Sequence, residues 1–100
     1  MEVIRQKEGK TLTVTLKGRL NANTAPLLER ELFPDLDDVY DLRFDFSQLE
    51  YLSSAGLRLL LIWFKAMVDK GGSLRVLHPR PEVMEILEMT GFVMFLPIEA

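Results

Sequence analysis

The sequence predicts a single α/β domain over residues 1–100, with helices packed on a mixed, mostly parallel β-sheet. Two segments, 11–17 and 40–46, alternate strictly between apolar and polar residues, which is typical of half-buried strands. Apolar helical segments separate the later strands, and strands joined through crossover helices run parallel to one another. With 100 residues, of which 48% are hydrophobic, the chain is long enough to bury one core.

The chain is expected to begin with a β-hairpin. Val3 and Ile4 suit a short first strand, and a turn at 8–10 contains Gly9, which can adopt a positive φ. In the second strand, 11–17, leucine and valine side chains fall on one side, and threonine and lysine side chains fall on the other. This alternation predicts one face against a core and one face toward water.

A first helix is expected to follow the segment 21–26. Asn23 or Thr24 can cap it, and Pro26 falls in its first turn, where the missing N–H has no cost. Pro34 then ends the helix. Apolar residues at helical spacing are expected to form its buried stripe: Leu27, Leu28, Leu32 and Phe33.

The remaining elements are expected to alternate between strands and helices. Their expected ranges, beginning with a strand, are 39–46, 54–70, 74–77, 82–89 and 95–98. In the first of these strands Tyr40, Leu42 and Phe44 alternate with charged residues, and the glycine pair at 71–72 stops the long helix. The expected order over the whole chain is therefore β-β-α-β-α-β-α-β.

The composition excludes several classes of function. A formal net charge of −3 gives no basic surface for nucleic acid, and the longest apolar run, 59–64, is far shorter than the roughly 20 residues that span a bilayer. The sequence has no cysteine, a single histidine at His78 and no glycine-rich phosphate loop. We therefore expect no catalytic activity, no metal and no cofactor. We also expect a cytoplasmic protein without membrane insertion.

The stretch 45–61 contains the one place where the residues point to a functional site. A strand ends, a short loop follows, and Ser53 and Ser54 precede the long helix. A hydroxyl at either position can cap the free N–H groups of the first helical turn, and helix N-termini favour anions. The stretch therefore places two hydroxyls where a phosphate would be tolerated.

A helical wheel divides the helix 54–70 into two faces. One face, called the exposed stripe below, holds Ser54, Arg58, Leu61, Ile62 and Lys65, with Ala55 on its flank. The opposite, core side holds Leu57, Leu60, Trp63, Phe64 and Met67. Two interpretations of the exposed stripe stay open. It is either an ordinary solvent face with a few exposed aliphatic residues, or a docking surface for a partner with a hydroxyl at its head.

The sequence resembles STAS domains, the anti-sigma factor antagonists of bacteria, over nearly the whole chain. The resemblance is carried by the segments 16–21, 45–47 and 51–57 and by the order of the strands. It implies a STAS-like fold and a small switch protein. In that family the unphosphorylated protein binds an anti-sigma factor of the serine kinase type and frees the sigma factor. Phosphorylation by that kinase before this helix ends the binding, and a phosphatase resets the protein.

Three residues depart from the family's pattern, which commonly reads Asp-Ser-Ser/Thr-Gly at the start of this helix. Ser53 replaces the aspartate, Ala55 replaces the serine or threonine directly before Gly56, and Asn21 replaces an acidic residue after the second strand. Ser54 and Ser53 are therefore the phosphorylation candidates, unless the domain is not switched by phosphorylation.

The resemblance and the wheel together predict a partner-binding surface around this motif. Its expected members are Asn21, Ser53, Ser54, Ala55, Gly56, Arg58, Leu61, Ile62 and Lys65. Similar domains also serve as partner-binding subunits that are not phosphorylated, for example the small cytoplasmic subunit of a lipid ABC transporter. That role is the alternative to an anti-sigma factor antagonist.

Overall fold

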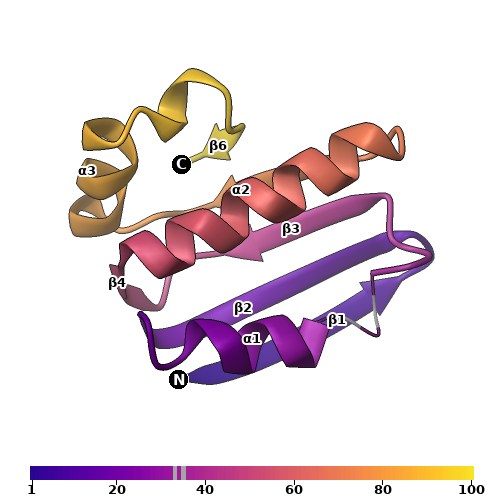
Figure 1. The fold of residues 1–100 in the computed structure, drawn as a ribbon, viewed down its shortest axis with the longest axis horizontal. Coiled ribbons are helices and arrows are strands. Elements are labelled where there is room, and N and C mark those ends of the chain that lie inside the picture. Colours follow the sequence, from indigo (N-terminus) through magenta and orange to yellow (C-terminus); the bar gives the residue numbers. More distant parts are fainter. Residues whose placement is uncertain (33, 35) are drawn as a thin grey trace.

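The computed structural model describes residues 1–32, 34 and 36–100, which are arranged around one mixed β-sheet (Figure 1). The strands are β1 (Glu2–Glu8), β2 (Thr11–Leu20), β3 (Asp41–Asp45), β4 (Leu49–Leu52), β5 (Ser73–Leu77) and β6 (Ile98–Glu99). The helices are α1 (Ala25–Leu32), α2 (Ser54–Asp69), α3 (Pro81–Met89) and the short 3-10 helix η2 (Phe92–Met94). The expected α/β class is confirmed.

The order of strands in the sheet is β1-β2-β3-β5-β6, and β4 pairs with β2. The β1–β2 hairpin is antiparallel, whereas β2 with β3, β2 with β4, β3 with β5 and β5 with β6 are parallel. The long strand β2 pairs with β3 along residues 11–15 and with β4 along residues 18–20, with an irregularity between Gly18 and Arg19. The expected parallel crossovers are confirmed.

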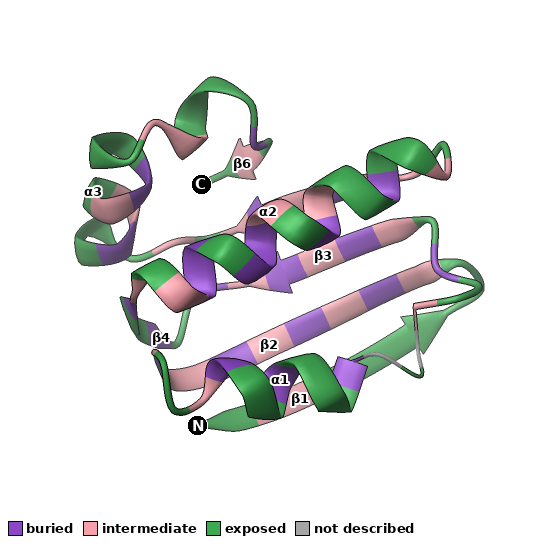
Figure 2. Ribbon diagram, viewed as in Figure 1, coloured by how far each residue is buried: buried purple, intermediate pink, exposed green. Residues whose placement is uncertain are grey.

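One face of the sheet is buried beneath α1 and α2 (Figures 1 and 2). Along β2, Leu12, Val14 and Leu16 are buried and the residues between them are half-buried, so the predicted alternation is confirmed. At the centre of this core Trp63 of α2 stacks on Phe44 of β3, with ring centroids 5.5 Å apart and an angle of 17° between the ring planes. The helix α3 packs beside β4.

The other face of the sheet is polar and held by arginine–carboxylate pairs. Arg43 on β3 donates from Nη2 to Oδ2 of Asp41 at 2.7 Å, and Arg75 on β5 donates from Nη1 to Oε2 of Glu99 at 2.9 Å. Partial burial acts to raise the pKa of Asp41, but the hydrogen bond from Arg43 and the charges of Arg43 and Arg75 outweigh it. The pKa of Asp41 is therefore lowered from its ordinary value.

The strand β4 was not expected from the sequence, which predicts a loop there, and the order in the structure is β-β-α-β-β-α-β-α-β. Leu49 and Leu52 of this strand are buried, while Glu50 and Tyr51 between them are exposed. Two adjacent exposed residues break the two-residue alternation by which a strand is recognised. The strand forms because the far end of β2 offers its backbone groups for pairing.

The expected strand 39–46 is too long at its beginning, since β3 starts at Asp41. Tyr40 does not join the buried positions of β3; its side chain is 39% exposed. The Nζ atoms of Lys10 and Lys70 lie 4.9 and 4.7 Å from the centroid of its ring. The alternation of buried apolar residues in β3 therefore begins at Leu42, two residues later than the sequence predicts, because cation–π contacts hold the tyrosine at the surface.

The two ends of the chain also differ from expectation. The strand β1 extends from Glu2 to Glu8, well beyond Val3 and Ile4, because hydrogen bonds to β2 sustain an edge strand that is largely exposed. The last strand was predicted at 95–98, but β6 is shorter and begins later, at Ile98–Glu99. Residues 92–94 form η2, and Phe95 directly after it is 41% exposed, with its ring beside those of Phe64 and Phe92.

The helix α1 confirms part of its predicted stripe. Leu28 and Leu32 are fully buried, whereas the burial predicted for Leu27 is wrong, because this side chain is 50% exposed on the outer side of the helix. Phe33 lies outside the residues that the structure describes. The expected capping residue Thr24 directly precedes the helix, and its carbonyl oxygen accepts from the Leu28 N–H at 3.0 Å.

Candidate functional site

The N-terminus of α2 separates the two serines by their environment. Ser53 is the N-cap: its Oγ accepts from the Gly56 N–H at 3.5 Å, and its carbonyl oxygen accepts from the Leu57 N–H at 2.9 Å. Ser54 is the first residue of the helix and is exposed. Of the two expected capping positions, Ser53 has that role, and Ser54 is open to solvent.

The parallel pairing of β2 with β4 brings Asn21 next to this turn. Leu20 pairs with Leu52, and the Ser53 N–H donates to the carbonyl oxygen of Leu20 at 2.9 Å. Asn21 follows Leu20 directly, so Asn21 and Ser53, which are far apart in the sequence, lie at neighbouring strand ends. This arrangement is the carboxyl edge of parallel strands, where ligands commonly bind in α/β sheets.

The side chain of Asn21 is occupied by local structure. Its Oδ1 accepts from the Asn23 N–H at 2.9 Å and from the Thr24 N–H at 3.1 Å. In turn, the Asn21 N–H donates to Oγ1 of Thr24 at 2.9 Å. Asn21 therefore shapes the turn into α1, which an aspartate at this position could also do. Its predicted contact with a partner stays a prediction.

Gly56 allows the start of α2 to approach the sheet closely. A Cβ atom placed on it would lie 2.7 Å from Cδ1 of Leu52 and 2.8 Å from Cγ of Leu20. Atoms do not approach so closely without displacement, so a larger residue at this position would force the two leucine side chains to shift. Gly56 is buried, and its predicted contact with a partner stays a prediction.

The two predicted faces of α2 are largely confirmed. Ser54, Arg58, Ile62 and Lys65 are exposed, and on the core side Leu57, Leu60, Trp63 and Met67 are buried. Two residues differ in degree. Leu61 is half-buried rather than fully in water, and Phe64 is half-buried rather than fully in the core, with its ring centroid 5.3 Å from that of the exposed Phe95.

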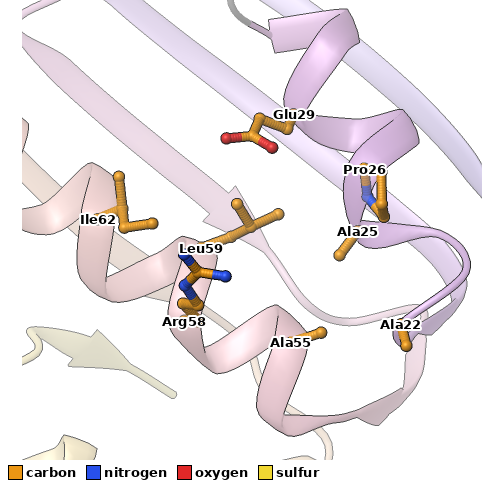
Figure 3. A pocket seen from close by; sticks show the side chains of 8 residues that line it. All are labelled: Ala22, Ala25, Pro26, Glu29, Ala55, Arg58, Leu59 and Ile62. Carbon is orange, nitrogen blue, oxygen red and sulfur yellow. The ribbon is translucent and has the colours of Figure 1, made fainter.

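A groove of about 300 Å³ separates α1 from α2 beside this site (Figure 3). It is lined by Ala22, Ala25, Pro26 and Glu29 from the α1 side and by Ala55, Arg58, Leu59 and Ile62 from α2. Three predicted partner-binding residues, Ala55, Arg58 and Ile62, line this groove, and Ser54, Leu61 and Lys65 do not. The exposed stripe is thus divided between a groove wall and an open helix surface.

Sequence reasoning missed the α1 side of this groove. The helical pattern of α1 shows which residues are buried, but not which helix lies beside it. A right-handed crossover places a helix on one fixed face of the sheet, and the strand order β2-β3-β5 adds strands in one direction. That order puts α1 and α2 side by side. The contribution of α1 to the groove could therefore be predicted only once the strand order is known.

We also searched the described residues for a metal site and for a membrane-spanning helix. No group of three or more histidine, cysteine or acidic residues in 1–32, 34 and 36–100 could hold a metal ion. Within the same part of the chain, no helix has the length and apolar character needed to cross a membrane.

Comparisons with known proteins place these features in a family. A model of the STAS domain matches residues 2–100. The chain is 32% identical to BtrV of Bordetella bronchiseptica, which carries the name of an anti-sigma factor antagonist, over 98% of this chain and 85% of that protein. It is 27% identical to the anti-sigma-B factor antagonist of Bacillus subtilis, over 97% of this chain and 88% of that one.

Solved structures agree with this fold. An anti-sigma factor antagonist of Thermotoga maritima superposes with a TM-score of 0.89 at 17% identity, covering 98% of this chain and 86% of that one. Unphosphorylated SpoIIAA, another anti-sigma factor antagonist, superposes with a TM-score of 0.84 at 17% identity, covering 99% and 89%. Anti-sigma factor antagonists are regulators without enzymatic activity, and the expectation that this chain is not an enzyme agrees with its similarity to them.

Proposed function

This chain belongs to the STAS domain family, and on that basis we propose that it is a cytoplasmic antagonist that binds an anti-sigma factor of the serine kinase type. The observation that carries the proposal is the first turn of α2, where Ser54 is exposed at the head of a solvent-facing helix surface. The names of its relatives, which align over nearly the whole chain, support the same role.

Ser54 is the better candidate for phosphorylation because its side chain is accessible. Ser53 is half-buried, and its Oγ already accepts from the Gly56 N–H. A phosphate brings about −1.5 to −2 charges, and the dipole at a helix N-terminus favours a negative charge there. The folded domain therefore tolerates the modification, and its effect is felt by the partner as repulsion and as the cost of desolvating the phosphate. A phosphatase would restore binding.

The test combines a kinase assay with a binding assay. The purified chain is incubated with ATP and a purified anti-sigma factor kinase from the same organism, and the modified residue is identified by mass spectrometry. We expect phosphate on Ser54, loss of labelling in Ser54→Ala, and labelling retained in Ser53→Ala. In calorimetric titrations Ser54→Asp should bind the kinase more weakly than the wild type while its Tm stays nearly unchanged. Wild-type affinity in Ser54→Asp would contradict a switch at this residue.

A second candidate function follows from the role of Ser53. This residue stands where the family commonly has an aspartate, and its side chain acts as a helix cap. A first turn that serves only packing and capping suits a subunit that binds its partner without being phosphorylated, such as the small subunit of a lipid ABC transporter. Stable binding to a transporter ATPase, with no binding to any anti-sigma factor kinase, would favour this alternative.

A further inference from the structure

The groove between α1 and α2 has the dimensions of two turns of helix. On the α1 side its lining recurs at positions 22, 25, 26 and 29, and on α2 at 55, 58, 59 and 62. The α2 set has the spacing of one helix face over two turns, which is a length of about 10 Å, whereas Ala22 lies in the turn before α1 and the other three residues lie on that helix. The groove's volume of about 300 Å³ is twice the roughly 150 Å³ of a cavity that holds one benzene. The groove therefore has room for two medium-sized apolar side chains.

The groove has an apolar floor between two opposite charges. Ala25 and Leu59 are buried at its base, and Ile62 adds a third aliphatic side chain. Glu29 extends from α1 toward α2, and Arg58 stands on the α2 side (Figure 3). Both residues are exposed, and among the described residues neither forms an ion pair with the other or with a third group. The acidic wall and the basic wall therefore each remain open to a charge of opposite sign.

We propose that this groove receives an amphipathic helix of the anti-sigma factor, which inserts two aliphatic side chains between α1 and α2. A basic residue of that helix faces Glu29, and an acidic residue faces Arg58. Aliphatic residues three or four positions apart on a helix lie about 5–6 Å from each other, so two of them fit along the groove. This inference rests on the proposed function, since it names how the same partner is bound.

The groove is also continuous with the surface expected to bind the partner. Arg58 and Ile62 belong both to the exposed stripe and to the groove lining, and Ala55 lies in the turn that begins with Ser54. A helix seated in the groove would therefore end close to Ser54. A phosphate there would act on the same bound segment, which joins the docking site to the proposed switch.

The test measures the Kd between the purified chain and the purified anti-sigma factor kinase, using two pairs of matched variants. In the first pair, Ile62→Asp places a charge in the groove, and Val68→Asp places the same charge on an exposed part of α2 outside it. In the second pair, Glu29→Lys reverses the charge of the groove wall, and Glu85→Lys reverses an exposed charge on α3. Thermal melts establish that all four variants are folded.

We expect Ile62→Asp and Glu29→Lys each to raise the Kd about tenfold or more, and both control variants to stay within about twofold of the wild type. Wild-type binding by Ile62→Asp and Glu29→Lys would overturn the groove proposal and leave the proposed function standing. Failure of the wild-type chain to bind the kinase would overturn both. A small apolar molecule that co-purifies with the wild type, and is lost in Ile62→Asp, would assign the groove to a different occupant and also overturn the proposal.

Discussion

Ser53 and Ser54 are neighbours in the chain, but the structure gives them different environments. The side chain of Ser53 is turned toward the backbone of the first helical turn, where its Oγ accepts from the Gly56 N–H. Ser54 follows it and is exposed. One serine therefore contributes to the stability of α2, and the next is accessible to a kinase and to a partner.

This difference predicts unequal sensitivities to alanine substitution. Ser53→Ala removes the cap and should lower the free energy of unfolding by about 1 kcal/mol, as N-cap substitutions commonly do. Ser54→Ala removes an exposed hydroxyl and should change it by less than about 0.5 kcal/mol. Urea unfolding followed by circular dichroism measures both. Equal losses in the two variants would show that the cap at Ser53 is not the stabilising contact.

Gly56→Ala should destabilise the protein even though alanine favours helices. Alanine is preferred over glycine inside a helix by about 1 kcal/mol. The new methyl group would, however, lie within 3 Å of Leu20 and Leu52, and such overpacking costs about 1–3 kcal/mol. We expect this packing cost to outweigh the gain in helix propensity, so the midpoint of urea unfolding should fall. A rise in that midpoint would mean that the two leucine side chains move aside.

At the scale of elements, α2 has a strongly buried side and a side that is largely in water. Its buried side meets the sheet through Trp63, which stacks on Phe44 of β3. Its other side includes Ile62, which is 43% exposed and lines the groove beside α1. Substitutions on the two sides should therefore separate stability from binding.

Trp63→Ala should cost about 3–5 kcal/mol of unfolding free energy, because it truncates a large aromatic side chain in the core. Trp63 is only 6% exposed, and its stacking partner Phe44 is fully buried. Guanidinium unfolding measures the loss. Ile62→Ala, on the same helix, is the control and should cost less than about 1 kcal/mol. Similar costs for the two variants would contradict the assignment of faces on α2.

Leu61→Asp should weaken partner binding and also cause a modest loss of stability. Leu61 belongs to the exposed stripe but is half-buried, so part of its apolar surface is shielded in the folded protein. Complete burial of a leucine side chain is worth about 1.5–3 kcal/mol, and half of that suggests a loss of about 1 kcal/mol. Calorimetric titration and thermal melts measure the two effects. Val68→Asp is the matched control, since Val68 is 53% exposed. Complete unfolding of Leu61→Asp would show that this residue belongs to the core.

At the scale of the whole molecule, the sheet has one apolar face and one charged face. The charged face depends on Asp41, which accepts hydrogen bonds from Arg43 at 2.7 and 3.0 Å. Arg75 lies 3.9 Å from the other carboxylate oxygen of Asp41. Positions on the adjacent strands β3 and β5 are thus connected through one carboxylate, on the face opposite α2.

This arrangement predicts that acid lowers the stability of the protein. The pKa of Asp41 is lower in the folded state than its ordinary value of 3.8, despite the opposing effect of partial burial. A lowered pKa contributes stability that is present above the unfolded pKa and is lost as the pH falls through the folded pKa. The free energy of unfolding from urea titrations should therefore decline below about pH 4. Asp41→Asn should have a flatter decline, and an unchanged slope would contradict the role of this group.

The sequence alone determined the features that depend on neighbouring residues. The alternation of Leu12, Val14 and Leu16 predicted a half-buried strand, and the serine pair before a long apolar helix predicted a cap, which Ser53 forms. The α/β class followed because apolar helices between alternating strands leave few other ways to bury both. These patterns are local, since the period of a strand or helix is set by its own backbone.

Only the tertiary structure decided the features that depend on distant partners. The strand β4 exists because the end of β2 pairs with it, and its own residues lack the alternation of a strand. Tyr40 stays at the surface because Lys10 and Lys70 hold its ring. The groove beside Ser54 exists because the order of the strands places α1 next to α2. Each of these contacts joins segments far apart in the chain, where the sequence around one segment carries no information about the other.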